Sequence, residues 1–364
     1  MKIIRSAKCS LKFANEIKLA KLSDVLDEYT RVVNLFIESF WRECPSKAQL
    51  LKPIVDSVLP SCWLSARLRK VAAREAIDMI KAARKRWGDD AVRPTHHGKR
   101  MCVSSTIATL GASKTVDFDR WLHLASLGDK LRIDLPIKLH KQFHKWDSKG
   151  KRLESYVVTN EYIQFAFEVE TGPKKPKTVC VGIDTGIKAL ASLSTGEQLG
   201  TDVEEHIERI HRCTHGSKGQ RRASRALRQR MAEVAKEACD KASLVVVENL
   251  TGITKNTKLK RRLNKSMRRS IGRWNVRFWL DRLRMTCEET NVSYRSVSPY
   301  QTSLKCSSCG CVDRRNRSKE NFLCRNCGHA DNADINASKN ILERFLTGPY
   351  GAGCKPLSRQ LSTE

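Results

Sequence analysis

Three acidic residues stand where a predicted rigid element begins or ends. Asp184 ends the apolar segment TVCVGID, Glu248 lies at the end of SLVVVEN, and Asp334 opens the helical segment DINASKNILERFL. A charged group beside a buried strand is costly unless it is paired or bound to a metal. Three carboxylates around magnesium would remove that cost and could form a two-metal phosphodiester site, in which the ions hold the attacking water and the leaving oxygen.

Each of these acids, taken singly, has an ordinary structural explanation. Asp184 could be a turn residue before Gly186, Glu248 a solvated strand end, and Asp334 an N-cap. Their joint order is that of RNase H-like nucleases and integrases: an acid on a first strand, one on a later buried strand and one on a C-terminal helix. The GID-G turn also occurs in actin-like sugar kinases and ATPases, but that alternative explains neither the charge nor the cysteines of this chain.

Five of the fourteen cysteines crowd between residues 306 and 327, and four of these form two C-x-x-C pairs: Cys306, Cys309, Cys324 and Cys327. Fourteen residues separate the pairs, and Gly310 or Gly328 follows each one. This spacing is typical of four thiolates around a structural zinc ion. Cys311 and His329 lie nearby, but the two pairs already supply four ligands.

Positive charge dominates the chain. Its 364 residues include 68 Lys and Arg against 39 Asp and Glu, a formal charge of +29. Such an excess favours a polyanionic partner, because each neutralised phosphate releases counterions. Two basic runs, 211–230 and 255–284, could each be a solvated helix face, but their position around Glu248 favours phosphate contact. The expected nucleic-acid contacts are Lys218, Arg221, Arg222, Arg225, Lys260, Arg261, Arg262, Arg268, Arg269 and Arg273.

The sequence has no run of eighteen apolar residues and no secretory signal at its start. We therefore expect a cytoplasmic, nucleoid-associated protein of a bacterium or archaeon, with no membrane partner. The oligomeric state stays open.

The elements that must position these residues follow from periodicity. Helical spacing over about 15–42 and over 65–87 predicts two amphipathic helices, and alternation around 131–135 and 163–169 predicts a small antiparallel sheet or barrel. The segment TGPKKPK at 171–177 is the best linker candidate. Beyond it, hairpin strands followed by alternating helices and strands predict an α/β layer.

Several segments of the second half resemble the TnpB family of insertion-sequence proteins, which are similar to miniature type V CRISPR effectors. They are GIDTGIKALASLSTGE, HGSKGQRR, VVVENLTGI, VSPYQTSLKCSSCGC and CRNCGHADNADINASKNIL, and they appear in the order of the family. The resemblance covers about 178–346. It implies an α/β plus β-barrel protein with an RNase H-like (RuvC-like) nuclease domain, an inserted zinc ribbon and a preceding wedge-like β-barrel that carries a helical recognition insert.

The domain boundaries that follow are these: 1–14 first part of the wedge-like barrel, 15–100 helical recognition insert, 101–177 rest of the barrel and linker, 178–303 nuclease domain, 304–329 zinc ribbon, 330–346 last nuclease segment, and 347–364 disordered tail. The implied activity is RNA-guided cutting of DNA beside a short adjacent motif, with guide RNA and target DNA as partners. Two alternatives stay open: a nuclease-inactive RNA-guided repressor, and a miniature CRISPR effector rather than a transposon-encoded protein.

The family's metal acids map onto Asp184, Glu248 and Asp334, and its Asp-x-Asn-Ala motif onto Asp334, Asn336 and Ala337. We expect Asp184 to bridge two magnesium ions, with Glu248 and Asp334 each completing one. Three departures stand out. The N-terminus lacks the family's proline-containing opening, Leu304 replaces a common glutamine, and Asp331 lies three residues before Asp334 rather than two. Asp331 is thereby an outside candidate for the third ligand.

Overall fold

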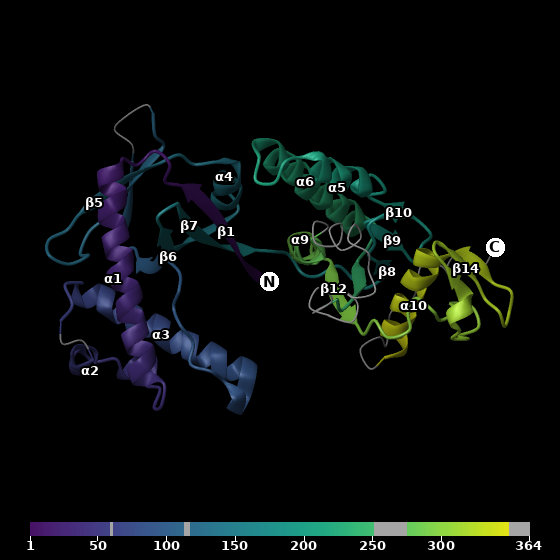
Figure 1. Ribbon diagram of the computed structural model, residues 1–364, viewed down its shortest axis with the longest axis horizontal. Coiled ribbons are helices and arrows are strands. Elements are labelled where there is room, and N and C mark those ends of the chain that lie inside the picture. Colours follow the sequence, from purple (N-terminus) through teal and green to yellow (C-terminus); the bar gives the residue numbers. More distant parts are fainter. Residues whose placement is uncertain (59–60, 113–116, 251–274, 349–364) are drawn as a thin grey trace. The chain divides into compact units, whose positions relative to one another are not determined.

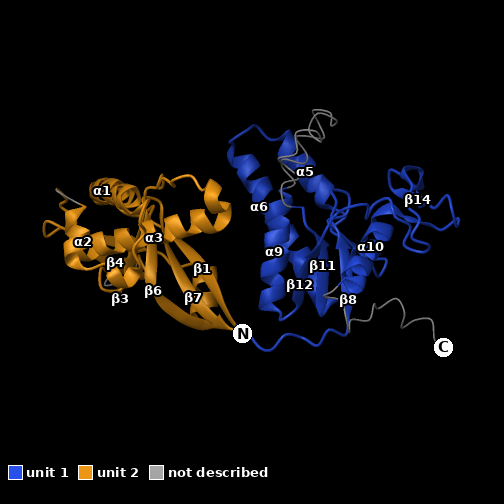
Figure 2. Cartoon of the chain, turned by 90° about the horizontal axis from the view of Figure 1, so that it is seen from below, with its two compact units in different colours: residues 1, 171–364 blue, residues 2–170 orange. Residues whose placement is uncertain are grey.

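The computed structural model describes residues 1–58, 61–112, 117–250 and 275–348. The chain divides into two compact units, one of residues Lys2–Glu170 and one of Met1 with Thr171–Glu364 (Figure 2). The division falls at the start of the predicted linker. Part of the predicted tail, 349–364, and the basic stretch 251–274 lie outside the described residues. In the described part of the chain, no helix is both long enough and apolar enough to cross a bilayer.

The unit of residues 2–170 contains a four-stranded antiparallel sheet with the order β1-β7-β6-β2. The strands are β1 (Lys2–Ser10), β7 (Tyr162–Glu170), β6 (Gly150–Thr159) and β2 (Arg100–Ser104). A second antiparallel sheet joins β3 (Ala108–Ala112), β4 (Arg120–Leu124) and β5 (Ile133–Ile137). The alternation around 163–169 is confirmed, because Ile163, Phe165 and Phe167 are fully buried.

Helices lie between β1 and β2 in the chain (Figure 1). They are α1 (Glu16–Phe40), α2 (Lys52–Ser57) and α3 (Ala66–Trp87), and α4 (Lys141–Asp147) follows β5. Asn15 and Ser65 begin the two long helices by accepting hydrogen bonds from Lys18 N and Leu68 N. Both predicted amphipathic helices are therefore confirmed, and their apolar faces share one core with the two sheets.

The second unit is built on a five-stranded sheet with the order β10-β9-β8-β11-β12. The central strands β8 (Cys180–Asp184), β11 (Leu244–Glu248) and β12 (Ser293–Val297) run parallel, and β9 (Ala191–Leu193) and β10 (Gln198–Leu199) complete an antiparallel edge. Parallel strands need crossover connections, which helices supply here. The predicted α/β alternation is thus confirmed.

Helices cover both faces of this sheet. Val181, Ile183, Val245 and Val247 share a core with α5 (Val203–Arg212), α6 (Lys218–Asp240) and α9 (Val276–Glu289). The alternate strand residues, Cys180, Leu244 and Val246, share a core with Ile341, Leu342 and Phe345 of α10 (Ala333–Thr347). Trp279 of α9 is fully buried.

A small three-stranded sheet precedes α10. It consists of β13 (Arg317–Ser318), β14 (Asn321–Leu323) and β15 (Ala330–Asn332), with a short 3₁₀ turn at Arg314–Asn316. β15 leads directly into α10, so this small sheet is joined without a linker to the helix that covers the larger sheet.

Candidate metal centres

The larger sheet brings Asp184 and Glu248 to one edge. β8 and β11 are paired in parallel with Val247 opposite Ile183, so the next residue on each strand ends the strand at the same edge. Side chains alternate across a strand. Asp184 and Glu248 belong to the alternation that packs against α10, and both carboxylates therefore project on the α10 side of the sheet.

α10 carries Asp334 in its first turn. Its N-cap is Asn332, whose Oδ1 accepts hydrogen bonds from Asp334 N at 2.9 Å and Ile335 N at 3.2 Å. The alternative of Asp334 as an N-cap is therefore wrong, and its carboxylate is left for other contacts. Gly182 permits the close approach of α10 to β8, because a β-carbon there would lie 2.2 Å from the carbonyl oxygen of Ser338.

The three acids line one cavity of about 840 Å³. Burial is the largest cause that raises the pKa of Asp184 to about 7, and the carboxylates of Glu248 and Asp334 add to the shift. Burial also raises the pKa of Glu248, which argues against a solvated strand end. Raised carboxylate pKa values mark a site short of positive charge, and a divalent cation would supply it. Oxygen donors of this kind fit magnesium.

Arg317 of β13 also lines the cavity and was not among the predicted site residues. Its Nη2 lies 2.7 Å from Oδ1 of Asp334. The guanidinium partly neutralises the acids, since it also lowers the pKa of Asp184 and Glu248. No sequence signal distinguishes Arg317 from the other arginines of this basic chain, because its role depends on where the small sheet packs.

Thr302 is a second residue that sequence reasoning missed. It is 2% exposed, lines the cavity, and donates a hydrogen bond from its hydroxyl to Oε1 of Glu248. This bond lowers the pKa of Glu248 against the effect of burial. The signal that could have found it is its place in the motif VSPYQTSLKC, directly before the first cysteine pair.

Asp331, the outside candidate for the third ligand, is not among the residues that line the cavity. Its Oδ2 lies 2.7 Å from Nζ of Lys339 and 3.7 Å from Nε2 of His329. The structure therefore brings together Asp184, Glu248 and Asp334 in one cavity. Asp331 pairs with Lys339 instead.

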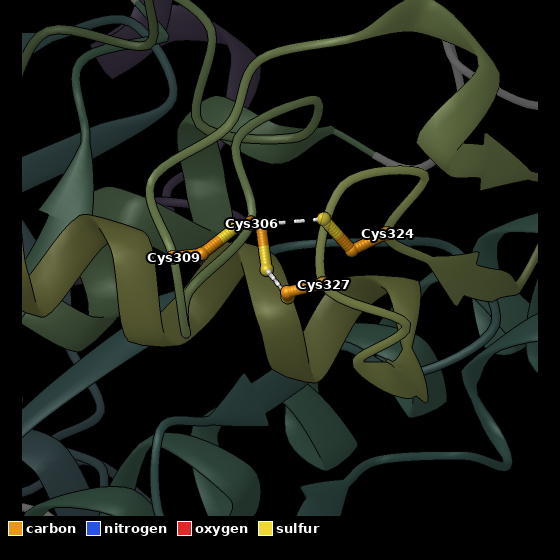
Figure 3. Close-up of side chains that lie close together, drawn as sticks. All are labelled: Cys306, Cys309, Cys324 and Cys327. Atoms are coloured by element: carbon orange, nitrogen blue, oxygen red, sulfur yellow. Dashed lines mark hydrogen bonds between the residues drawn. The ribbon is translucent and has the colours of Figure 1, made fainter.

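The four cysteines of the two C-x-x-C pairs converge on one point (Figure 3). Their sulfur atoms all lie within 4.8 Å of one another, and Cys306–Cys327 and Cys309–Cys324 are separated by 3.8 and 3.5 Å. Four sulfurs at about 2.3 Å from a tetrahedral zinc ion are about 3.8 Å apart. The cluster therefore has the dimensions of a structural zinc site. It is the only group of three or more potential ligands that the described residues hold in so compact an arrangement.

The local backbone explains this convergence. Gly310 and Gly328 adopt positive φ values of 77° and 72°, which glycine reaches without strain, and their N–H groups donate back to the carbonyls of Cys306 and Cys324. The N–H of Cys311 is the largest cause that lowers the pKa of the Cys309 thiol to about 6. The turn thus favours the thiolate that zinc requires. Cys311 and His329 are not members of the cluster.

The predicted nucleic-acid contacts are described only in part. Lys218, Arg221, Arg222 and Arg225 are exposed on α6, and no carboxylate of the described residues pairs with any of them. Residues 218, 222 and 225 are spaced by four and three positions, which places them on one side of the helix. The contacts predicted between 251 and 274 lie outside the described residues: Lys260, Arg261, Arg262, Arg268, Arg269 and Arg273.

Comparison with known proteins bears on the second unit. Residues 279–341 match the family model described as "Cas12f1-like, TNB domain", a stretch that holds all four clustered cysteines. The chain is 33% identical over 141 residues to a TnpB-like protein of Aquifex aeolicus (strain VF5), which covers 35% of this chain and 43% of that protein. The chain is related to the TnpB family. The resemblance predicted from the sequence motifs is thereby confirmed.

The relationship extends from TnpB to CRISPR-associated proteins. The chain is 44% identical over 55 residues to the CRISPR-associated endodeoxyribonuclease Cas12f1 of Sulfoacidibacillus thermotolerans, over 15% of this chain and 13% of that protein. Its fold is similar to that of the Cas12f1 chain in a cryo-EM structure of a Cas12f1–sgRNA–target DNA complex, with a TM-score of 0.52, 15% identity, and coverage of 90% and 83%. At that identity the likeness concerns the fold alone. This TnpB-related chain spans about half, or less, of the curated relatives it matches.

Proposed function

We propose that this chain is an RNA-guided DNA endonuclease that hydrolyses phosphodiester bonds with magnesium. The observation that carries the proposal is the single cavity lined by Asp184, Glu248 and Asp334. Carboxylate oxygens suit magnesium, and the relationship to TnpB and Cas12f1 proteins supports nucleic acid as the substrate. The actin-like alternative explains none of these relatives.

We assign residues 178–303 and 330–346 to a RuvC-like nuclease domain, with 304–329 as an inserted zinc ribbon. The parallel sheet covered by helices on both faces supports the first assignment, and the compact thiolate cluster supports the second. In the first half, we assign 1–14 and 101–177 to a wedge-like barrel around a helical recognition insert at 15–100. The antiparallel sheets and the helices between β1 and β2 support that division.

Magnesium, when bound, supplies Lewis-acid stabilisation of the charge that develops in an in-line displacement at phosphorus. Asp184 would hold it from the centre of the cavity, with Glu248 and Asp334 on either side. Thr302 keeps Glu248 oriented by donating its hydroxyl proton. Arg317 donates to Asp334 and has further N–H groups that can bind a phosphate oxygen. Hydrolysis would leave a 5′ phosphate and a 3′ hydroxyl.

Guide RNA and target DNA are the proposed partners. The exposed row of Lys218, Arg222 and Arg225 on α6 supports contact with a phosphate backbone, because no described carboxylate neutralises it. Pairing with the guide would select the target, and the protein would recognise only a short motif beside it.

The proposal is tested with the protein co-expressed with its flanking genomic DNA, so that it is purified with its own RNA. Asp184→Ala should lower the rate of magnesium-dependent cutting of a matched DNA at least about a thousandfold, because it removes the central ligand. RNA affinity should change less than about threefold. Asp281→Ala is the matched control, since Asp281 is an exposed acid on α9 that pairs with Arg277.

Equal loss of cutting and RNA binding in Asp184→Ala would contradict these roles. A wild-type complex that binds matched DNA without cutting it at any magnesium concentration would instead support the repressor alternative. Sequencing of the bound RNA separates the two genetic contexts: repeat-derived ends would identify a miniature CRISPR effector, and a single transposon-derived species a TnpB protein.

A further inference from the structure

α10 carries two buried asparagines in addition to Asp334. Asn336 is fully buried, and its side chain contacts the backbone on both sides of the zinc-cluster residue Cys306. Its Nδ2 donates to the carbonyl of Lys305 at 2.8 Å, and its Oδ1 accepts from the N–H of Ser307 at 2.9 Å. One amide therefore fixes the first cysteine pair on the helix that also bears Asp334.

Asn340 extends this contact towards the carboxylate cavity. The side chain is 3% exposed, and its Nδ2 donates to the carbonyls of Thr302 at 2.9 Å and Lys305 at 2.6 Å. The hydroxyl of Thr302 in turn donates to Glu248. A continuous set of hydrogen bonds thus leads from the backbone beside Cys306, through Asn340 and Thr302, to a carboxylate of the cavity.

The chemistry of these side chains argues for a positioning role. Asn340 is 3% exposed, and a polar group held away from water in this way costs free energy unless it is hydrogen-bonded. Both hydrogen bonds of Asn340 come from Nδ2, whereas its buried Oδ1 has no hydrogen-bond partner among the described residues, so the amide lowers stability while its bonds fix one arrangement of the partners. The partners here are the carbonyls of Thr302 and Lys305, which flank the entry into the ribbon.

We propose that Asn336 and Asn340 are positioning residues that couple the four-cysteine cluster to the carboxylate cavity. With zinc bound, the segment 302–307 is held on α10 and Thr302 orients Glu248. Without zinc, the first cysteine pair loses its constraint, the segment is released, and the affinity of the carboxylates for a divalent cation falls. The inference rests on the proposed magnesium site and adds that zinc controls it from a distance.

The test measures Mn²⁺ binding to the full-length protein by electron paramagnetic resonance, with zinc content determined on the same samples. Asn340→Leu is compared with Ser338→Ala, since Ser338 is also buried on α10 but its hydroxyl donates to Ile335 O of its own helix. With zinc bound, we expect Asn340→Leu to weaken Mn²⁺ binding about tenfold at unchanged zinc content, and Ser338→Ala to match the wild type. Removing zinc should weaken wild-type Mn²⁺ binding about tenfold and change Asn340→Leu little further.

A second pair of variants keeps the test decisive if Asn340→Leu does not fold. Thr302→Val removes only the hydroxyl that contacts Glu248, and Thr302→Ser restores it. Weaker Mn²⁺ binding in the valine variant and recovery in the serine variant support the coupling. Mn²⁺ binding that is equal with and without zinc in the wild type overturns this inference alone. A wild type that binds no Mn²⁺ overturns the proposed magnesium site, and the inference with it.

Discussion

The two candidate metal centres of the second unit are built in opposite ways. The thiolate centre takes its four ligands from 22 residues of sequence, 306–327, and its sulfurs form one compact group. The carboxylate centre takes its ligands from β8, β11 and α10. Its first and last ligands, Asp184 and Asp334, are 150 positions apart in the sequence. Two tight turns set the geometry of the first, whereas the packing of a helix on a sheet sets that of the second.

Electrostatics separates the two centres as well. Hydrogen bonds from the backbone of Cys311 and from Asn326 lower the pKa of Cys309 to about 6, so the turn itself favours the charged ligand. Burial and two neighbouring carboxylates raise the pKa of Asp184 to about 7, so the fold disfavours the charged ligand until a cation is present. The thiolate centre should stabilise the fold once zinc is bound, and the carboxylate centre should destabilise the fold in the absence of a cation.

The largest effect is expected from Cys306→Ser. Loss of one thiolate should release the zinc and unfold the ribbon, because structural zinc contributes about 10 kcal/mol or more to small folded sites. Zinc content per chain is the measurement, with Cys311→Ser as the matched control, since Cys311 packs beside the cluster without belonging to it. Full zinc retention in Cys306→Ser would contradict the ligand set.

Gly182→Ala should disturb the carboxylate centre and spare the thiolate centre. The added β-carbon would lie 2.2 Å from Ser338 O and 2.9 Å from Leu342 Cβ, so α10 must move away from β8. We expect a loss of about 3 kcal/mol in unfolding free energy and at least tenfold weaker Mn²⁺ binding, at unchanged zinc content. Gly196→Ala is the comparison variant, since nothing lies within 4 Å of its added β-carbon, although its positive φ adds backbone strain. Mn²⁺ binding weakened equally by both would refute the packing argument.

Asp184→Asn should stabilise the metal-free protein. The folded-state pKa of about 7 exceeds the ordinary value of 3.8, so the folded state binds the proton more tightly and its stability falls as the pH rises from about 4 to 7. The amide side chain introduced by the substitution does not ionise, so the variant does not lose stability in this way as the pH rises. Thermal melting in a chelator for magnesium should therefore give a gain of about 4 kcal/mol at pH 8 that shrinks towards pH 4. A gain in stability that does not change with pH would show that the substitution does not act through the raised pKa of Asp184.

The smallest effect is expected from Asn332→Ala. This substitution removes the N-cap of α10, which accepts from Asp334 N and Ile335 N, and such caps contribute about 1 kcal/mol. Loss of the cap should fray the first turn of α10, which carries Asp334, so Mn²⁺ binding should weaken about threefold. Asn321→Ala on the neighbouring strand β14 is the control, and equal melting temperatures for the two variants would argue against the cap.

Periodicity and spacing predicted much of this molecule. The two long helices, the strands that end in Asp184 and Glu248, and the four clustered cysteines all follow from local patterns. The alternative of Asp334 as an N-cap is wrong because Asn332, two residues earlier, accepts from the first N–H groups of α10. Arg317 could not be predicted, since it is one arginine among many, whereas the place of Thr302 directly before the first cysteine pair was a signal that composition and periodicity do not use.

The sequence by itself determined the ligand types and the elements that carry them. A C-x-x-C turn acts over a few residues, and strand alternation assigns Asp184 and Glu248 to one face once the strands are known. Only the tertiary structure decided that α10 packs on that face against Gly182, that Arg317 reaches Asp334, and that buried amides join the ribbon to the cavity. These contacts join residues far apart in the chain, and their geometry depends on how side chains fill the core between a helix and a sheet, which no local pattern encodes.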